Sequence, residues 1–308
     1  MLIYRYRPLT KRTIEYIENR QLYFSNPLNF NDPFDCDLNC LTISESDDID
    51  SSYSQYINLL EQRYNFIGKF ITHYSVRIND NDDPVKERYY YDDVVEVYFK
   101  EIRALAEELH VLKNTPKENR KKALSESWET KKNNVINNLG VVCFSESRSN
   151  ILMWSHYASD HKGVCIEYNS NERPIKFWKN FKFHKVTYQD ERNIDVLSRG
   201  FTDSFYDLLT VKSPDWAYED EHRLITIKGP GPQKQTMQSL NGIILGARIK
   251  ENDKRELALF YTTLKNVDKQ RRSLKKLKYY IASKDNNTFS ININEASNLE
   301  ELKVYLEL

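Results

Sequence analysis

Glycine is scarce in this sequence, and no glycine-rich motif occurs in it. Only eight of the 308 residues are glycine. Phosphate-binding loops of the P-loop and Rossmann types need several closely spaced glycines, because their backbone approaches the phosphates closely. We therefore expect no nucleotide site of either type.

The chain also lacks a net charge. Its 45 acidic residues balance its 45 basic residues. No long-range basic field is present to steer the whole molecule onto nucleic acid, although a local basic patch is compatible with this balance.

Cysteine and long apolar runs are limited as well. Cys36 and Cys40 form a C-x3-C pair, but no second Cys or His pair follows at zinc-ribbon spacing, so we expect no metal there. Cys143 and Cys165 lie in apolar segments, where a buried free thiol is usual. No apolar run approaches the ~20 residues that span a bilayer. These features predict no membrane contact and a cytoplasmic location.

The densest apolar and aromatic stretch is Val141–Tyr168. It contains a β-branched run, a polar turn, apolar residues at helical spacing and a second apolar run. Gly163 is positioned to end the helix in a left-handed conformation. The stretch therefore predicts a strand at Val141–Phe144, a turn at Ser145–Asn150, a helix at Ile151–Ala158 and a strand at Val164–Tyr168.

The whole pattern predicts an α+β fold. The segment Leu2–Arg7 alternates along its length, with Tyr4 and Tyr6 on one face and Arg5 and Arg7 on the other. Residues 44–139 carry helical patterns instead, which predicts a helical insertion between two parts of one mixed core, residues 1–43 and 140–308. A separate helical domain is the alternative.

Acidic residues precede the apolar run 224–227. On a strand, Glu219, Glu221 and Arg223 would share a face, and two carboxylates so placed can hold a ribose hydroxyl and polarise a reacting sugar. The alternative is a solvated strand start, with Glu221 paired to a basic neighbour.

Basic and polar residues supply the other candidates. Arg5 and Arg7 can grip a diphosphate, or they can blunt the pairing of an edge strand. Ser145 and Ser147 can orient a ligand or only bond backbone groups. His156 is either a catalytic residue or a hydrogen-bonded core histidine.

A metal site is a further alternative. Asn31, Asp32 and Asp35 can bind a divalent ion together with Glu219 or Glu221, or they can form a turn network that needs no ion.

Six motifs in order resemble a bacterial family catalogued as domain of unknown function 2971. The resemblance covers both ends of the chain and skips the predicted insertion. Its motifs are FNDPFD (30–35), VCFS (142–145), MWSHYA (153–158), KGVCIEY (162–168), WAYEDEHR (216–223) and ILG (244–246).

A more distant resemblance is to ADP-ribosyltransferases. These enzymes have a split β-sheet, an Arg or His on the first strand, a Ser or aromatic motif on a middle strand and a Glu at the start of a later strand. The order Arg, Ser, Glu-x-Glu is present here, although its spacing is stretched by the insertion. The resemblance implies a split mixed sheet, NAD as substrate and no metal. It implies catalytic roles for Glu221, Glu219 and Ser145 and cofactor-binding roles for Arg5, Arg7, Ser147, Tyr6 and His156.

These observations predict an NAD-dependent ADP-ribosyltransferase-like effector, such as a toxin or phage-defence protein that modifies nucleic acid or protein. Two alternatives stay open. One is a metal-dependent hydrolase or nuclease that uses Asp32, Asp35, His156, Glu219 and Glu221. The other is a non-enzymatic sensing module with the insertion as its docking surface.

Overall fold

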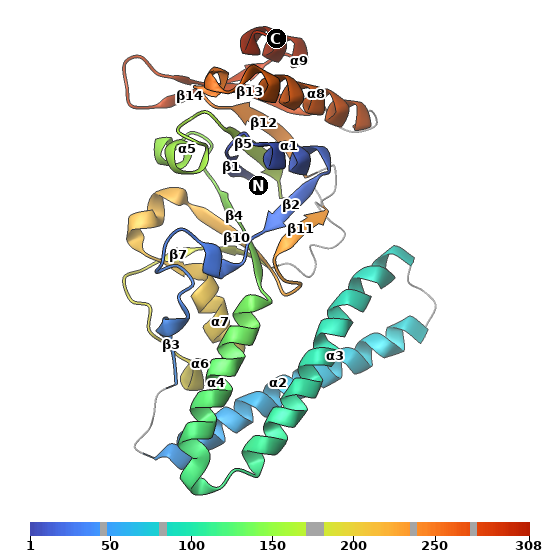
Figure 1. Ribbon diagram of the computed structural model, residues 1–308, viewed down its shortest axis with the longest axis vertical. Coiled ribbons are helices and arrows are strands. Elements are labelled where there is room, and N and C mark those ends of the chain that lie inside the picture. The colour runs from blue at the N-terminus through green and yellow to red at the C-terminus, as the bar shows by residue number, and fades with distance from the viewer. Residues whose placement is uncertain (44–47, 80–84, 171–181, 235–238, 272–275) are drawn as a thin grey trace.

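The computed structural model describes residues 1–43, 48–79, 85–170, 182–234, 239–271 and 276–308, with the side chains of 73–94 and 182 left out. An eight-stranded mixed sheet forms the centre of the body (Figure 1). All its neighbouring strands are antiparallel except β12 and β13, which are parallel. The large mixed sheet and the many helices confirm the predicted α+β class. In spatial order the strands are β14 (Ile291–Ala296), β13 (Lys278–Lys284), β12 (Leu240–Leu245), β5 (Val164–Asn169), β1 (Leu2–Arg7), β4 (Gly140–Ser145), β10 (Glu221–Thr226) and β6 (Lys182–Lys185).

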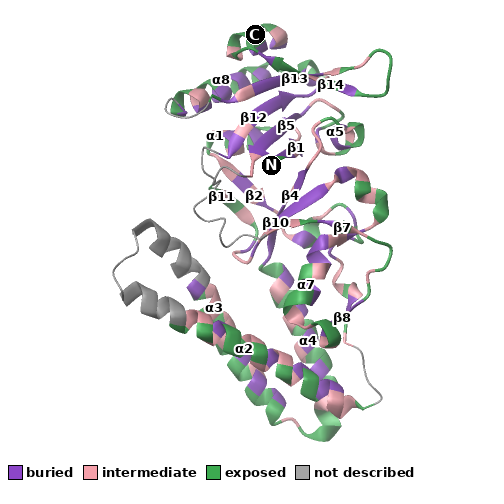
Figure 2. Ribbon diagram, turned by 180° about the vertical axis from the view of Figure 1, so that it is seen from behind, coloured by how far each residue is buried: buried purple, intermediate pink, exposed green. Residues whose placement is uncertain are grey.

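Helices cover both faces of this sheet. One face packs against α1 (Lys11–Glu18), α8 (Lys254–Gln270) and α9 (Leu299–Leu306) in one apolar core. The other packs against α5 (Ile151–Tyr157), whose Trp154 is fully buried. The buried residues of Figure 2 accordingly follow the central strands.

Capping residues fix where two of these helices begin. The Thr10 side chain accepts a hydrogen bond from the Thr13 amide at the start of α1. The Asn150 side chain accepts from the Leu152 and Met153 amides at the start of α5. A side-chain oxygen at this position satisfies amides that have no partner inside the helix.

Strand β1 lies in the middle of the sheet, between β5 and β4. The prediction that Arg5 and Arg7 blunt an edge strand is therefore wrong. The predicted alternation is present: Tyr4 and Tyr6 belong to the core beneath α5, whereas Ile3 belongs to the core beneath α1. The two arginines follow Ile3 at the odd positions, on the α1 face.

The sheet opens between β1 and β4. These two strands share one register pair, Tyr4 with Ser145, whereas β1 and β5 pair at all six positions. Farther along β4, Val141 pairs instead with Ser25, at the end of β2 (Gln21–Phe24). The two strands thus separate beyond this pair, and Ser25 pairs with β4 there instead.

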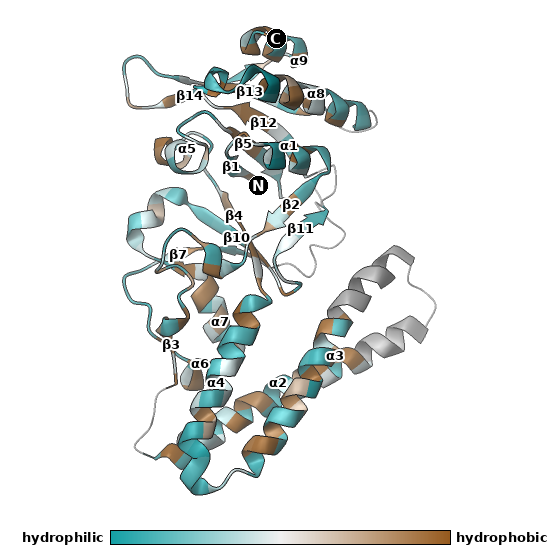
Figure 3. Cartoon of the chain, viewed as in Figure 1, coloured by the Kyte–Doolittle hydropathy of each residue, from teal (hydrophilic) through white to brown (hydrophobic). Residues whose placement is uncertain are grey.

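Three helices within residues 48–137 form an arm and its base (Figures 1 and 3). The long helices α2 (Ile49–Asn79) and α3 (Val85–Lys113) pack along each other, and α4 (Arg120–Asn137) returns the chain to β4. They share a second apolar core with α7 (Phe201–Thr210). The start of the predicted insertion, residues 44–47, lies outside the described residues.

Gly163 precedes β5, and the predicted role for it is wrong. Its φ is not positive; Ser159, Asp160 and His161 adopt the left-handed conformation instead. Gly163 is needed for a close approach, because a Cβ there would lie 2.2 Å from the carbonyl oxygen of Arg7.

Gly163→Ala is therefore expected to destabilise the fold by about 1–3 kcal/mol, since backbone must move to relieve the clash. Gly68→Ala in α2 is the matched control. Its nearest contact is 3.8 Å away, so the change should stabilise by about 0.5–1 kcal/mol. Urea unfolding of both variants tests this, and equal effects would contradict it.

Candidate functional site

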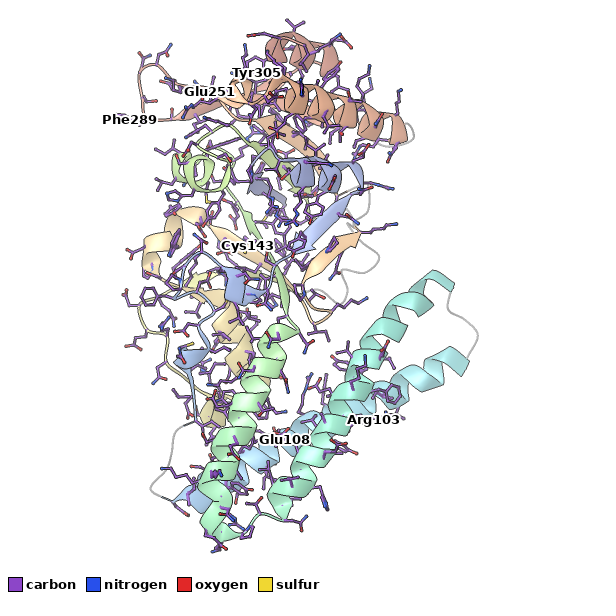
Figure 4. All side chains as sticks on the ribbon, in the orientation of Figure 1. Arg103, Glu108, Cys143, Glu251, Phe289 and Tyr305 are labelled. Atoms are coloured by element: carbon purple, nitrogen blue, oxygen red, sulfur yellow. The ribbon has the colours of Figure 1, made fainter. Side chains whose placement is uncertain are left out.

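A cavity of about 180 Å³ lies where β1 and β4 separate. Figure 4 places Cys143, one of its lining residues, in the middle of the body and well away from Arg103 and Glu108 on the arm. The cavity brings together six of the eight predicted site residues, from both ends of the chain. These are Arg5, Tyr6, Arg7, Ser145, Glu219 and Glu221.

The two acidic residues reach the cavity from different elements. Glu219 is the last residue of the 3-10 helix η5 (Pro214–Glu219), and Glu221 is the first of β10. Asp220 between them is left-handed, with φ of 44°. The prediction that Glu219 and Glu221 share a strand face is therefore wrong for Glu219. Glu221 and Arg223 do share a strand face. The carboxylates of Glu219 and Glu221 are both buried.

Lys212 joins the two carboxylates. It ends β9 (Val211–Lys212), and its Nζ lies 2.6 Å from Glu219 Oε2 and 3.2 Å from Glu221 Oε2. The Tyr157 hydroxyl donates to Glu219 Oε1 at 2.6 Å. Lys212 and Tyr157 also line the cavity. Both glutamates are thus held in fixed positions at its wall.

Arg223 binds Glu221 from the other side. Its Nε donates to Glu221 Oε1 at 2.8 Å and one terminal nitrogen donates to Oε2 at 3.0 Å. The same guanidinium donates to both carboxylate oxygens of Asp35, at 2.9 and 2.5 Å. Arg223 is fully buried, so these carboxylates are the groups that compensate its charge. The predicted pairing of Glu221 with basic neighbours is present, but the predicted solvation is not.

The environments of the two glutamates differ. Burial tends to raise the pKa of Glu221, but the charges of Arg223 and Lys212 outweigh it and lower that pKa to about 2. Burial raises the pKa of Glu219, and the charge of Glu221 adds to this against the opposing effect of Lys212. Two carboxyl groups with separated pKa values can divide the work of holding charge and of accepting a proton.

Glu221 should make the fold sensitive to acid. Its pKa is about 2 when folded and 4.5 in the unfolded reference. Its contribution to stability is therefore complete above pH 4.5 and is lost as the pH falls toward 2. We expect the free energy of unfolding of the wild type to fall through that range more steeply than that of Glu221→Gln. Identical pH profiles of the two proteins in urea unfolding would contradict this.

Two arginines that line the same cavity, Arg5 and Arg7, have no acidic partner among the described residues. Arg5 donates to the Tyr23 carbonyl at 3.1 Å, and among the described residues no ion pair involves Arg5 or Arg7. Burial, followed by the charge of Arg7, lowers the pKa of Arg5 to about 10. Burial also lowers the pKa of Arg7. An anion placed here would compensate both charges.

The predicted polar residues fall into two groups. Ser145 and Tyr6 line the cavity; Ser145 Oγ accepts from the Ser147 amide at 3.0 Å, and the Tyr6 hydroxyl donates to the Ser147 carbonyl at 2.8 Å. Ser147 and His156 do not line it. His156 is exposed on α5, with Nδ1 3.0 Å from the Tyr218 hydroxyl, so the prediction of a core histidine is wrong.

The described residues contain no group of three or more His, Cys, Asp and Glu side chains arranged to hold a metal ion. Asp35 binds Arg223, and Asp32 accepts a hydrogen bond from the Phe34 amide at 2.9 Å. These contacts match the turn network that was the alternative to an ion for Asp32 and Asp35. All four cysteines are free.

A larger cavity, of about 450 Å³, lies on the far side of Lys212. Its arginines are already paired: Arg192 with Asp37 at 2.6 Å and Arg199 with Asp207 at 2.5 Å. It contains none of the predicted site residues. We therefore take the smaller cavity as the candidate site, because unpaired cations and a fixed acid pair meet there.

Sequence reasoning missed Lys212, Tyr157 and Tyr188. Lys212 is an ordinary lysine before a turn, and only the chain's return to β10 brings it between the acids. The Tyr188 hydroxyl accepts from the Glu221 amide at 2.9 Å. Arg223 was noted only as a face-sharing neighbour. The one sequence signal for these cations was the acidic cluster at 219–221, because buried carboxylates require cations nearby.

Residues 153–224 match the family described as “Protein of unknown function (DUF2971)”. This range contains the motifs MWSHYA, KGVCIEY and WAYEDEHR, so it supports the predicted resemblance to that family over this part of the chain. No significant match was found among curated proteins or among solved structures. Among the described residues, no helix is long and apolar enough to cross a membrane.

Proposed function

We propose that this protein is an NAD-dependent ADP-ribosyltransferase-like enzyme, with its site in the split between β1 and β4. The observation that carries the proposal is one cavity lined both by two arginines without an acidic partner among the described residues and by the buried pair Glu219 and Glu221. The toxin or phage-defence role, and the choice between nucleic acid and protein as acceptor, remain part of this proposal.

The guanidinium side suits a diphosphate. Arg5 and Arg7 are two residues apart on one strand, and bidentate, charge-assisted hydrogen bonds to phosphate oxygens are a common use of arginine. Partly buried cations without a carboxylate partner bind an anion more strongly than exposed ones, because water screens them less.

The acid side suits the reacting ribose. When the bond between ribose C1′ and the nicotinamide nitrogen breaks, its electron pair leaves with nicotinamide and positive charge develops on the ribose. In this proposal ionised Glu221, at the wall of the cavity, stabilises that charge. The acceptor then forms a new bond to C1′, and Glu219 takes the proton that the acceptor loses. Ser145 orients the ribose.

The size of the cavity limits what it holds. Pockets for small molecules usually measure about 300–1,000 Å³. At about 180 Å³ the cavity is smaller than this, so we propose that it takes only the nicotinamide ribose end of NAD.

The test is incubation of the purified protein with labelled NAD, alone and with protein or nucleic-acid acceptors. Release of nicotinamide and transfer of label support the proposal; neither product with any acceptor class contradicts it. A parallel melting screen separates the metal-dependent alternative. NAD should raise the melting temperature, whereas Mg²⁺ or Mn²⁺ alone should not.

Arg5→Gln and Arg7→Gln should each weaken NAD binding. A charge-assisted hydrogen bond contributes about 1.5–3 kcal/mol, so each dissociation constant should rise about tenfold or more. Arg255→Gln is the matched control, because Arg255 is exposed on α8 and outside the cavity. Calorimetric titration measures all three. Unchanged affinity in both cavity variants would remove the diphosphate role.

A non-enzymatic module is the second candidate, and one observation favours it. Lys212 and Arg223 together bind both oxygens of Glu221, so the acid pair has a structural use without any substrate. Under this reading, Glu221→Gln changes stability but leaves biological activity intact.

A further inference from the structure

Among the interactions of the described residues, Lys212 is the one cation bound to both Glu219 and Glu221. Its side chain is 5% exposed, and its Nζ also lies 3.7 Å from Asp35 Oδ2. Its Nζ also lies over the Trp216 ring, 4.8 Å from the ring centroid. The ammonium is therefore fixed on several sides.

The two glutamates depend on this lysine unequally. Glu221 keeps two hydrogen bonds from Arg223 whether or not Lys212 is present. Among the interactions of the described residues, the one cation bound to Glu219 is Lys212, and its other partner is the neutral Tyr157 hydroxyl. Removal of the ammonium leaves Glu219 beside a second carboxylate with no positive charge bound to it.

Within the ion-paired network of Lys212, the carboxylates of Asp35, Glu219 and Glu221 oppose the cations of Lys212 and Arg223, which leaves one negative charge; without the lysine there are two. Arg5 and Arg7 line the same cavity and belong to no ion pair among the described residues. Neutral titratable groups complete the surroundings. They are Tyr157 from α5, Tyr188 from β7 (Thr187–Tyr188), Cys143 from β4 and Cys36 from the segment before η2 (Leu38–Cys40).

We propose that Lys212 is a positioning residue for the acid pair. Its ammonium keeps Glu219 ionised beside Glu221 near neutral pH, so that Glu219 can take up the proton that the acceptor loses. This role deepens the proposed function and rests on it. Burial already raises the pKa of Glu219 in the presence of Lys212. Loss of a cation at hydrogen-bond distance raises it further, since an opposite charge that near favours the ionised form.

The first experiment needs no NAD. The protonated carboxyl stretch is recorded by infrared spectroscopy against pH for wild type, Lys212→Met, Lys212→Arg and Lys212→Met/Glu219→Gln. We expect a protonated carboxyl in Lys212→Met at a pH where the wild type and Lys212→Arg show none, and we expect the double variant to lose it. If the band is absent from Lys212→Met, or persists in the double variant, the proposal is overturned. Should Lys212→Met fail to fold, Lys212→Gln takes its place.

The second experiment uses the activity. In Lys212→Met, the acid limb of the pH profile for nicotinamide release with acceptor present should move to higher pH by about 1 unit or more, and Lys212→Arg should restore it. A purely structural lysine would lower the rate without moving the limb, which would overturn the proposal. The two failures are distinguishable: a wild type without NAD turnover ends the proposed function, while the infrared titration still decides the role of Lys212.

Discussion

Glu221→Gln is expected to lower the rate of nicotinamide release by about 10²–10³-fold while NAD still binds. The substitution keeps the size of the side chain and removes its charge. Loss of one preorganised group that stabilises transition-state charge typically has an effect of this size. Ground-state binding depends on Arg5 and Arg7 instead, so kcat should fall and the dissociation constant for NAD should change little. Single-turnover kinetics and calorimetry measure the two quantities.

This experiment needs a control for the loss of a buried charge. Glu167→Gln on β5 supplies it. Glu167 is also fully buried in the sheet and also pairs with an arginine, Arg148, at 3.7 Å, but it does not line the cavity. It should leave turnover close to that of the wild type. Turnover retained in Glu221→Gln, or lost equally in both variants, would contradict the assignment of Glu221.

Arg223→Met is expected to destabilise the protein by about 3–5 kcal/mol. The substitution removes the cation that binds both Asp35 and Glu221, and it leaves three buried carboxylates, Asp35, Glu219 and Glu221, with Lys212 alone. Breaking a buried ion pair from one side has a cost of this order, because an uncompensated charge remains in a region of low dielectric. The loss should appear as a large shift of the urea midpoint at neutral pH.

Arg248→Met is the matched control for that measurement. Arg248 makes an equally short, bidentate pair with Glu251, at 2.8 Å for both bonds, but its side chain is 48% exposed. An exposed pair typically contributes about 0–1 kcal/mol. The account therefore predicts a large difference between two arginine pairs of similar geometry. Equal destabilisation of the two variants would show that burial does not set the energetics of the Arg223 network.

Local patterns in the sequence predicted the elements well where one physical rule dominates. The strand, helix and strand predicted within Val141–Tyr168 are present as β4, α5 and β5. The period-2 pattern of Leu2–Arg7 placed the arginines and tyrosines on the correct faces. It gave no information on the place of this strand in the sheet, because an alternating pattern fits an edge strand and a central strand with a half-open face equally well.

The site was predictable in part for a similar reason. The acids and the arginines were recognisable by type, and the fold brings them to one cavity. The backbone reversal at Asp220 was not recognisable, since aspartate occupies the left-handed region only occasionally. Lys212 has no local signal at all, because its role depends on the chain passing from β9 through η5 back to β10. Such non-local pairing is set by topology rather than by neighbouring residues.

The most direct test of the account is a crystal structure with a non-hydrolysable NAD analogue. The account predicts the diphosphate between Arg5 and Arg7, the nicotinamide ribose against Ser145 and Glu221, and Lys212 still bound to Glu219. An analogue bound outside the split between β1 and β4, or a split that stays closed to it at saturating concentration, would contradict the account.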